Sequence, residues 1–84
     1  MQDGLTPDEA EVAIAALSGS YPDATVMSGA TADGATFVIA IWNEPNDEVE
    51  TLTVRRQQGR YALVNTDGLP IVEADALEEI LAGT

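Results

Sequence analysis

The chain has 84 residues, with 15 Asp or Glu, three Arg and no His or Cys, which gives a formal net charge of −12. A chain of this length forms one domain with one modest core, so we expect a single domain over residues 1–84. Without Cys and His there is no disulfide, thiolate zinc site, thiol nucleophile or histidine-based catalytic triad.

A helix is predicted close to the amino terminus. Thr6 and Glu9 have the spacing of a capping box, and Pro7 suits the first position of a helix. Four apolar residues recur at helical spacing and form one stripe: Ala10, Ala13, Ile14 and Leu17. Gly19 is a natural stop for this helix.

Two strands are predicted next, over residues 24–31 and 36–42. Asp33-Gly34 lies between them and is typical of a hairpin turn. The second strand is apolar on both faces, with Phe37, Ile39 and Ile41 on one and Val38, Ala40 and Trp42 on the other. Such a strand usually lies centrally in a sheet, with both faces at least partly covered.

The remaining pattern predicts strands over residues 49–57 and 60–64, joined by a tight turn at Gln58-Gly59. Residues 69–72 indicate a short edge strand, limited by Pro70. A short helix ends the chain, with Asp75 and Glu78 at capping-box spacing or with a start two residues earlier. Its apolar stripe is expected to be Ala74, Leu77, Ile80 and Leu81.

These elements predict an α+β domain in the order α-β-β-β-β-α, with an antiparallel sheet of four strands, or five if residues 69–72 pair. Both amphipathic helices are expected on one face of the sheet. We expect Val38 and Trp42 on the opposite face, where a long loop or a second copy of the chain would cover them.

The three arginines all lie around the Gln58-Gly59 turn, which gives a strongly acidic chain one cationic tip. Arg55 and Arg56 are neighbours and point to opposite faces of a regular strand, so at most two arginines converge on one anion. They either contact a carboxylate or phosphate of a partner or form ion pairs with nearby Glu residues that also protect the hairpin from aggregation.

Residues 43–48 are rich in oxygen ligands, but they lack the glycine and the spacing of a calcium-binding loop. We therefore predict no metal site and no cofactor. The serines have neither a His nor a Lys as a base, and no glycine-rich phosphate loop is present. The prediction is that the chain is not an enzyme.

The sequence thus favours a small acidic protein-interaction domain that binds a protein partner, either a basic protein or a second copy of the chain. The candidate contact residues are Val38, Trp42, Arg55, Arg56, Arg60 and Tyr61. Two alternatives stay open: an acidic mimic of nucleic acid that inhibits a basic protein, and a carboxylate-based protein or enzyme that uses a divalent ion.

Direct binding to nucleic acid or to a membrane is not expected. The charge of −12 opposes contact with phosphates over a broad surface. The longest apolar run, at residues 37–42, is far too short to span a membrane. The amino terminus lacks the basic start and apolar stretch of a signal peptide, so the expected compartment is the cytoplasm.

Overall fold

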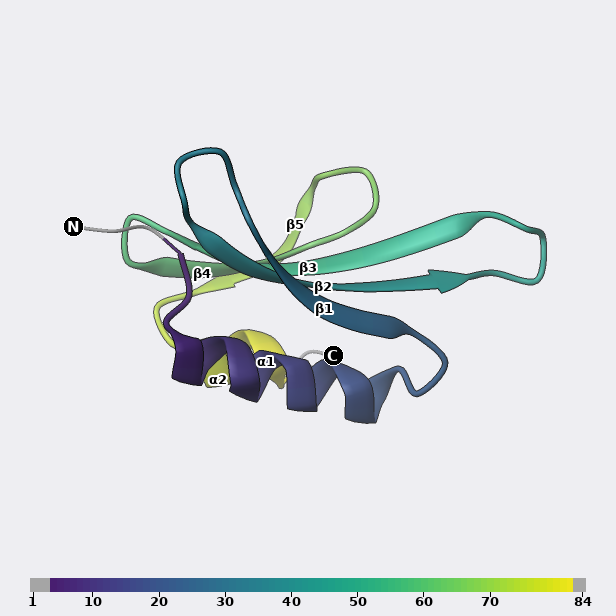
Figure 1. Cartoon of the computed structure of the whole chain (residues 1–84), viewed down its shortest axis with the longest axis horizontal. Coiled ribbons are helices and arrows are strands. Elements are labelled where there is room, and N and C mark those ends of the chain that lie inside the picture. Colours follow the sequence, from purple (N-terminus) through teal and green to yellow (C-terminus); the bar gives the residue numbers. More distant parts are fainter. Residues whose placement is uncertain (1–3, 83–84) are drawn as a thin grey trace.

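The computed structural model describes residues 4–82, which form a five-stranded antiparallel sheet with two helices on one face (Figure 1). The elements are α1 (Pro7–Ser20), β1 (Thr25–Ala30), β2 (Thr36–Asn43), β3 (Val49–Gln57), β4 (Arg60–Val64), β5 (Pro70–Ala74) and α2 (Leu77–Leu81). The strands lie side by side in chain order. The α+β prediction is confirmed, and the fifth strand is present. Neither helix within residues 4–82 is long and apolar enough to cross a membrane.

The start of α1 is set by the predicted capping box. The Glu9 backbone N–H donates to the Thr6 hydroxyl, and the Thr6 backbone N–H donates to the Glu9 carboxylate. Pro7 occupies the first turn, where a missing N–H is not needed for the helix. The helix ends at Ser20, one residue after the predicted stop at Gly19, and Tyr21 is its carboxyl-terminal cap.

Tight turns hold the strands in register. Gln58 and Gly59 both have positive φ, 53° and 78°, as a two-residue hairpin turn between β3 and β4 requires. Gln57 therefore pairs with Arg60 and Arg56 with Tyr61. Because paired residues share a face, this register decides on which side of the sheet each arginine lies.

The core lies between the helices and the sheet. Helix α1 packs against β1 and β2, and α2 packs against β4 and β5. The buried core residues come from the facing surfaces of the helices and of the central strands: Leu5, Ala10, Ala13, Leu17, Val38, Ala40, Leu52, Val54, Tyr61, Leu63 and Ile80. The small side chains Ala10, Ala13 and Ala40 allow α1 to lie close to β2.

The segment before α1 is tied to the sheet, which the sequence does not predict. Gly4 donates its N–H to the Arg56 carbonyl, and Leu5 donates to the Thr36 carbonyl and is buried. Gly4 has a φ of 107°, and a Cβ there would lie 2.5 Å from the Thr36 nitrogen. Only glycine satisfies both conditions, so this contact depends on residue 4 being glycine.

The second helix, α2, begins later than the sequence predicts. The helix begins at Leu77 with Ala76 as an N-cap that makes no side-chain hydrogen bond. Asp75 is not the cap, and Ala74 belongs to β5, where it pairs with Tyr61. Strand pairing continues two residues past the predicted strand end, so the helix begins later than its capping-box spacing indicates.

Candidate functional site

The face of the sheet turned away from the helices carries a row of apolar side chains over β1, β2 and β3. The register places Met27 opposite Ile39, Gly29 opposite Phe37, and Asn43 opposite Val49 on this face. We call the following residues the open-face patch: Met27, Phe37, Ile39, Ile41 and Val49. Met27 is 46% exposed and Val49 is 52% exposed, whereas Phe37, Ile39 and Ile41 are half-buried. None of the five belongs to the core cluster under the helices.

Two of the predicted contact residues lie on the wrong side of the sheet for that role. Val38 is fully buried beneath the helices. Trp42 is half-buried on the same side, stacks on Tyr21 with ring centroids 5.0 Å apart, and donates its indole N–H to Glu44. The prediction that Val38 and Trp42 occupy the uncovered face is therefore wrong.

The reason for this error is that alternation along a strand divides residues between two faces but does not say which face the helices cover. On the covered face Ala40 is fully buried between Val38 and Trp42, and its small side chain suits the close packing of α1 on β2. Its size was visible in the sequence and is the signal that sequence reasoning missed.

Acidic side chains are absent from the open face of β1–β4. The register positions that point to this side carry Thr, Met, Gly, Phe, Ile, Asn, Val, Gln, Arg and Ala but no Asp or Glu. The first acid on this face within residues 4–82 is Glu73, which pairs with Ala62 on the edge strand β5. Within residues 4–82, the strands β1–β4 thus present no acid on this face of a chain that has 15 acids, and Asp33 of the β1–β2 turn stands at its edge.

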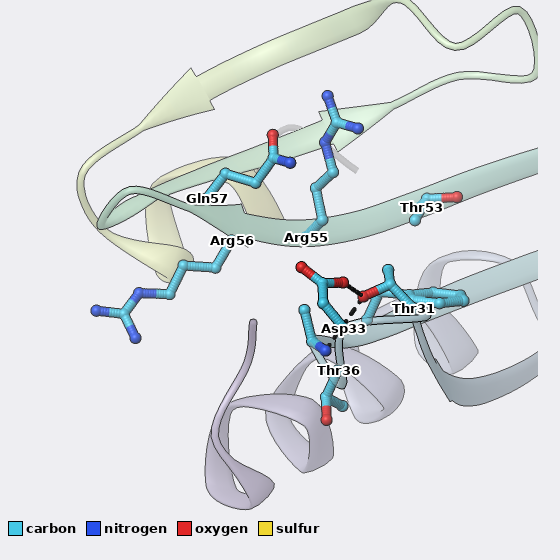
Figure 2. Close-up of a pocket in the computed structure, with 9 residues that line it drawn as sticks. Thr31, Asp33, Thr36, Thr53, Arg55, Arg56 and Gln57 are labelled. Atoms are coloured by element: carbon cyan, nitrogen blue, oxygen red, sulfur yellow. Dashed lines mark hydrogen bonds between the residues drawn. The ribbon is translucent and has the colours of Figure 1, made fainter. Parts of the chain in front are cut away.

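The three arginines do not all converge, but Arg55 and Arg60 share the open face and line one hollow together with Glu73. Arg55 lies on the open face and Arg56 on the helix side, as their alternation predicts, and their side chains point apart (Figure 2). Arg60 forms an exposed ion pair with Asp75, in which its Nε lies 3.4 Å from the carboxylate. Such exposed pairs contribute little to stability, about 0–1 kcal/mol.

Arg56 belongs to a small polar cluster with Tyr61 and Glu9 at the edge of the core. Its guanidinium carbon lies 5.6 Å from the centre of the Tyr61 ring, a cation–π contact. The Tyr61 hydroxyl donates a hydrogen bond to the Glu9 carboxylate. Arg56 Nε is buried and has no hydrogen-bond partner within residues 4–82. Tyr61 therefore joins α1 to the sheet and is not a free contact residue.

The ionisation of this cluster follows from its contacts. Burial raises the pKa of Glu9, but hydrogen bonds from the Thr6 backbone and the Tyr61 hydroxyl, together with the Arg56 charge, outweigh it and leave the pKa below 4.5. The hydrogen bond to Glu9 is the main cause that raises the pKa of Tyr61 above 10.0, and burial adds to it. Glu9 is therefore ionised and Tyr61 neutral at pH 7.

A hollow of about 340 Å³ lies where the open face meets the β1–β2 turn. Phe37 of β2 and Thr53, Arg55 and Gln57 of β3 line it, and Asp33 of the turn stands at its rim (Figure 2). The Phe37 ring lies over Gly29, where a Cβ would be 2.8 Å from the ring. The glycine of β1 thus makes room for the aromatic wall of the hollow.

No group of three or more Asp or Glu residues within residues 4–82 is arranged to hold a metal ion. In the oxygen-rich segment 43–48, Glu44 accepts the Trp42 N–H, and the Asn46 side chain accepts the Glu48 backbone N–H. These side chains thus serve the β2–β3 turn.

The comparisons with known proteins find no relative. No protein-family model matches the chain, and neither a curated protein nor a solved structure matches it significantly. What the chain does therefore has to be argued from its own surfaces.

Proposed function

We propose that the chain is a small non-enzymatic protein-interaction domain that associates with a second copy of itself through the open face of its sheet. The open-face patch is the observation that carries this proposal. Its five apolar side chains stand on a face that neither helix covers. An exposed apolar surface of this kind is typical of a contact between proteins.

Charge favours a second copy over a basic partner. A basic protein would be attracted to the acidic surfaces, not to a face that carries no acid on β1–β4. Two copies that meet through their open faces keep their negative charges apart. The open face resembles the core of a protein interface in this respect, because such cores are depleted in charged residues.

The shape of the open side limits where the second copy sits. The β1–β2 turn and the segment between β4 and β5 rise above the sheet on this side, whereas the long β2–β3 hairpin extends clear of both (Figure 1). Val49 and Ile41 are the patch residues nearest to the β2–β3 turn, because Val49 pairs with Asn43 and Ile41 with Thr51. We infer a two-fold contact in which each copy places this half of its sheet on the other.

The expected affinity is low. Three strands spaced by about 4.8 Å, with about 8 residues of 3.3 Å each, give the whole open face of β1–β3 an area of about 400 Å², which is an upper limit for the footprint. A stable interface buries about 800 Å² from each partner, so this contact is at most about half of the usual size. We therefore expect a monomer–dimer equilibrium in the micromolar range or weaker.

The test is solution mass as a function of concentration, measured by sedimentation equilibrium. Ile39→Asp should give a monomer at every concentration, because it places a charge at the centre of the patch. The matched control is Val12→Asp, which places the same charge on a residue that is 54% exposed on the outside of α1 and should leave the dimer intact. Met27→Glu on the edge strand is a second patch variant, for the case in which Ile39→Asp does not fold.

Three results would overturn the proposal. The first is a wild-type chain that stays monomeric at millimolar concentration, and the second is patch variants that fold and dimerise like the wild type. The third is a dimer that weakens as salt rises. Salt should strengthen the contact, because two copies of charge −12 repel each other. An acidic mimic of nucleic acid would show the opposite response with its basic target, since those opposite charges are screened.

A further inference from the structure

The hollow beside the β1–β2 turn contains an arginine that the chain leaves unpaired. Within residues 4–82, no carboxylate lies within ion-pair distance of Arg55, and no hydrogen bond engages its guanidinium. The other two arginines do have contacts: Arg60 pairs with Asp75, and Arg56 lies over Tyr61. In a chain with 15 acids and three arginines, an unpaired arginine in a hollow is a candidate contact for an external carboxylate.

The opposite side of the same hollow carries a negative charge. Asp33 accepts a hydrogen bond from the Thr31 hydroxyl, and the same hydroxyl accepts the Ala35 backbone N–H. These bonds hold the Asp33 carboxylate on the turn, and the bond from Thr31 is the main cause that lowers its pKa. Asp33 and Arg55 both line the hollow, but the Arg55 side chain extends away from Asp33 and the two do not pair, so both charged groups can contact a bound molecule (Figure 2).

We propose that this hollow binds a small apolar molecule that carries a carboxylate next to an N–H donor, the chemistry shared by a free apolar amino acid and the carboxyl terminus of a peptide. The carboxylate bonds to the Arg55 guanidinium through two parallel N–H···O bonds. The N–H group donates to Asp33. The apolar part lies against Phe37, and the size of the hollow, about 340 Å³, is within the range of small-ligand sites.

Three small molecules test separately what the carboxylate and the N–H donor of such a ligand contribute to binding. L-leucine carries the carboxylate, an ammonium and an apolar side chain. N-acetyl-L-leucine keeps the carboxylate but replaces the ammonium by an amide N–H, as at a peptide terminus. L-leucinamide keeps the ammonium and lacks the carboxylate. Binding is measured by backbone amide chemical shifts in NMR titrations, at protein concentrations where sedimentation shows a monomer.

We expect leucine, N-acetyl-leucine or both to shift the amides of residues 31–37 and 53–57, and leucinamide to leave them unchanged. Tighter binding of leucine identifies a free amino acid as the ligand, and equal or tighter binding of N-acetyl-leucine identifies a peptide terminus. The proposal is wrong if neither carboxylate binds at millimolar concentration, or if leucinamide binds as well as leucine.

Variants assign the contacts. Arg55→Gln should weaken the binding of the carboxylate probes by about tenfold or more, because it removes a charged, two-point contact. Arg60→Gln makes the same change in charge at a residue that lines a neighbouring hollow with Arg55 but not this one, so it should weaken binding much less than Arg55→Gln. Asp33→Asn should weaken the binding of leucine, because it removes the charge that the leucine ammonium contacts. The matched turn variant Asp67→Asn should leave the binding of leucine unchanged. Equal effects of Arg55→Gln and Arg60→Gln would contradict the assignment.

This site is tested separately from self-association. The titrations use the monomer, and Ile39 and Val49 do not line the hollow. Ile39→Asp should therefore abolish the dimer and still bind the carboxylate probes, whereas Arg55→Gln should lose the probes and still dimerise. Failure of one proposal leaves the result of the other intact.

Discussion

At the scale of single residues, Tyr61 is a residue that the sequence predicts as a surface contact but that the fold uses to join a helix to the sheet. The sequence presents it as an aromatic residue beside three arginines, a typical contact residue. In the fold it is buried, donates its hydroxyl to Glu9 and carries Arg56 on its ring. These contacts join α1 to β3 and β4, so we expect changes at Tyr61 to affect stability.

The Glu9–Tyr61 hydrogen bond makes part of the stability depend on pH. The folded state lowers the pKa of Glu9 below 4.5, so the stabilisation is present above that pH and is lost as the pH falls through the folded-state value. Tyr61→Phe should therefore lower the free energy of unfolding by about 1 kcal/mol at pH 7. The loss should shrink towards zero in acid, as measured by urea unfolding across pH.

The control for this prediction is Tyr21→Phe. Tyr21 stacks on Trp42, and no hydrogen bond within residues 4–82 engages its hydroxyl. Removal of that hydroxyl should change stability little at any pH. If Tyr61→Phe and Tyr21→Phe show the same dependence on pH, the bond to Glu9 does not contribute as the structure indicates.

At the scale of secondary-structure elements, the two helices differ in how well local sequence specifies them. Helix α1 has a complete capping box and a clear apolar stripe, and both are found in the structure. Helix α2 has five residues and no side-chain cap, because β5 continues to Ala74. A helix this short is held by its tertiary contacts, and Ile80 is its fully buried anchor.

Thr6→Ala tests the role of the capping box. The substitution removes the side chain that accepts the Glu9 N–H and should cost about 1 kcal/mol. For a domain of this size, that loss lowers Tm by about 4–8 °C. Ser18→Ala is the matched control on an exposed position of α1, and a change in Tm as large as that of Thr6→Ala would argue against a specific role for the cap.

At the scale of the whole molecule, charge is the dominant property. The acids within residues 4–82 lie on the helices, in the turns and on β3 and β5, and the one ion pair in this range is exposed. Like charges that are crowded by folding repel one another, and salt reduces this repulsion. The open-face register positions of β1–β4 carry no Asp or Glu, so the proposed contact between two copies would not bring acids of these strands together.

Stability should therefore rise with salt. We expect Tm to increase between about 0.01 M and 0.15 M ionic strength, where the screening length falls from about 30 Å to about 8 Å. The rise should be similar for sodium and potassium chloride, since it reflects screening and not a bound ion. A flat Tm would mean that the acids are better compensated than the single exposed ion pair indicates.

Local patterns in the chain were enough to predict α1, the first four strands, their turns and the α+β class, but they left the fifth strand open and placed the start of α2 too early. Capping spacing, alternation and turn dipeptides act over a few residues, and their physics is contained in those residues. The same is true of the opposite directions of Arg55 and Arg56, which follow from strand geometry alone.

The position of the uncovered face depended on packing between residues far apart in the chain. Residues 36–42 are apolar on both faces, so the pattern of this strand alone does not determine which face the helices bury. The packing of both helices buries the face of Val38 and Ala40 and leaves Phe37, Ile39 and Ile41 outside the core. The hollow at Arg55 likewise needs the β1–β2 turn to rise beside β3, a contact between segments twenty residues apart that no local pattern records.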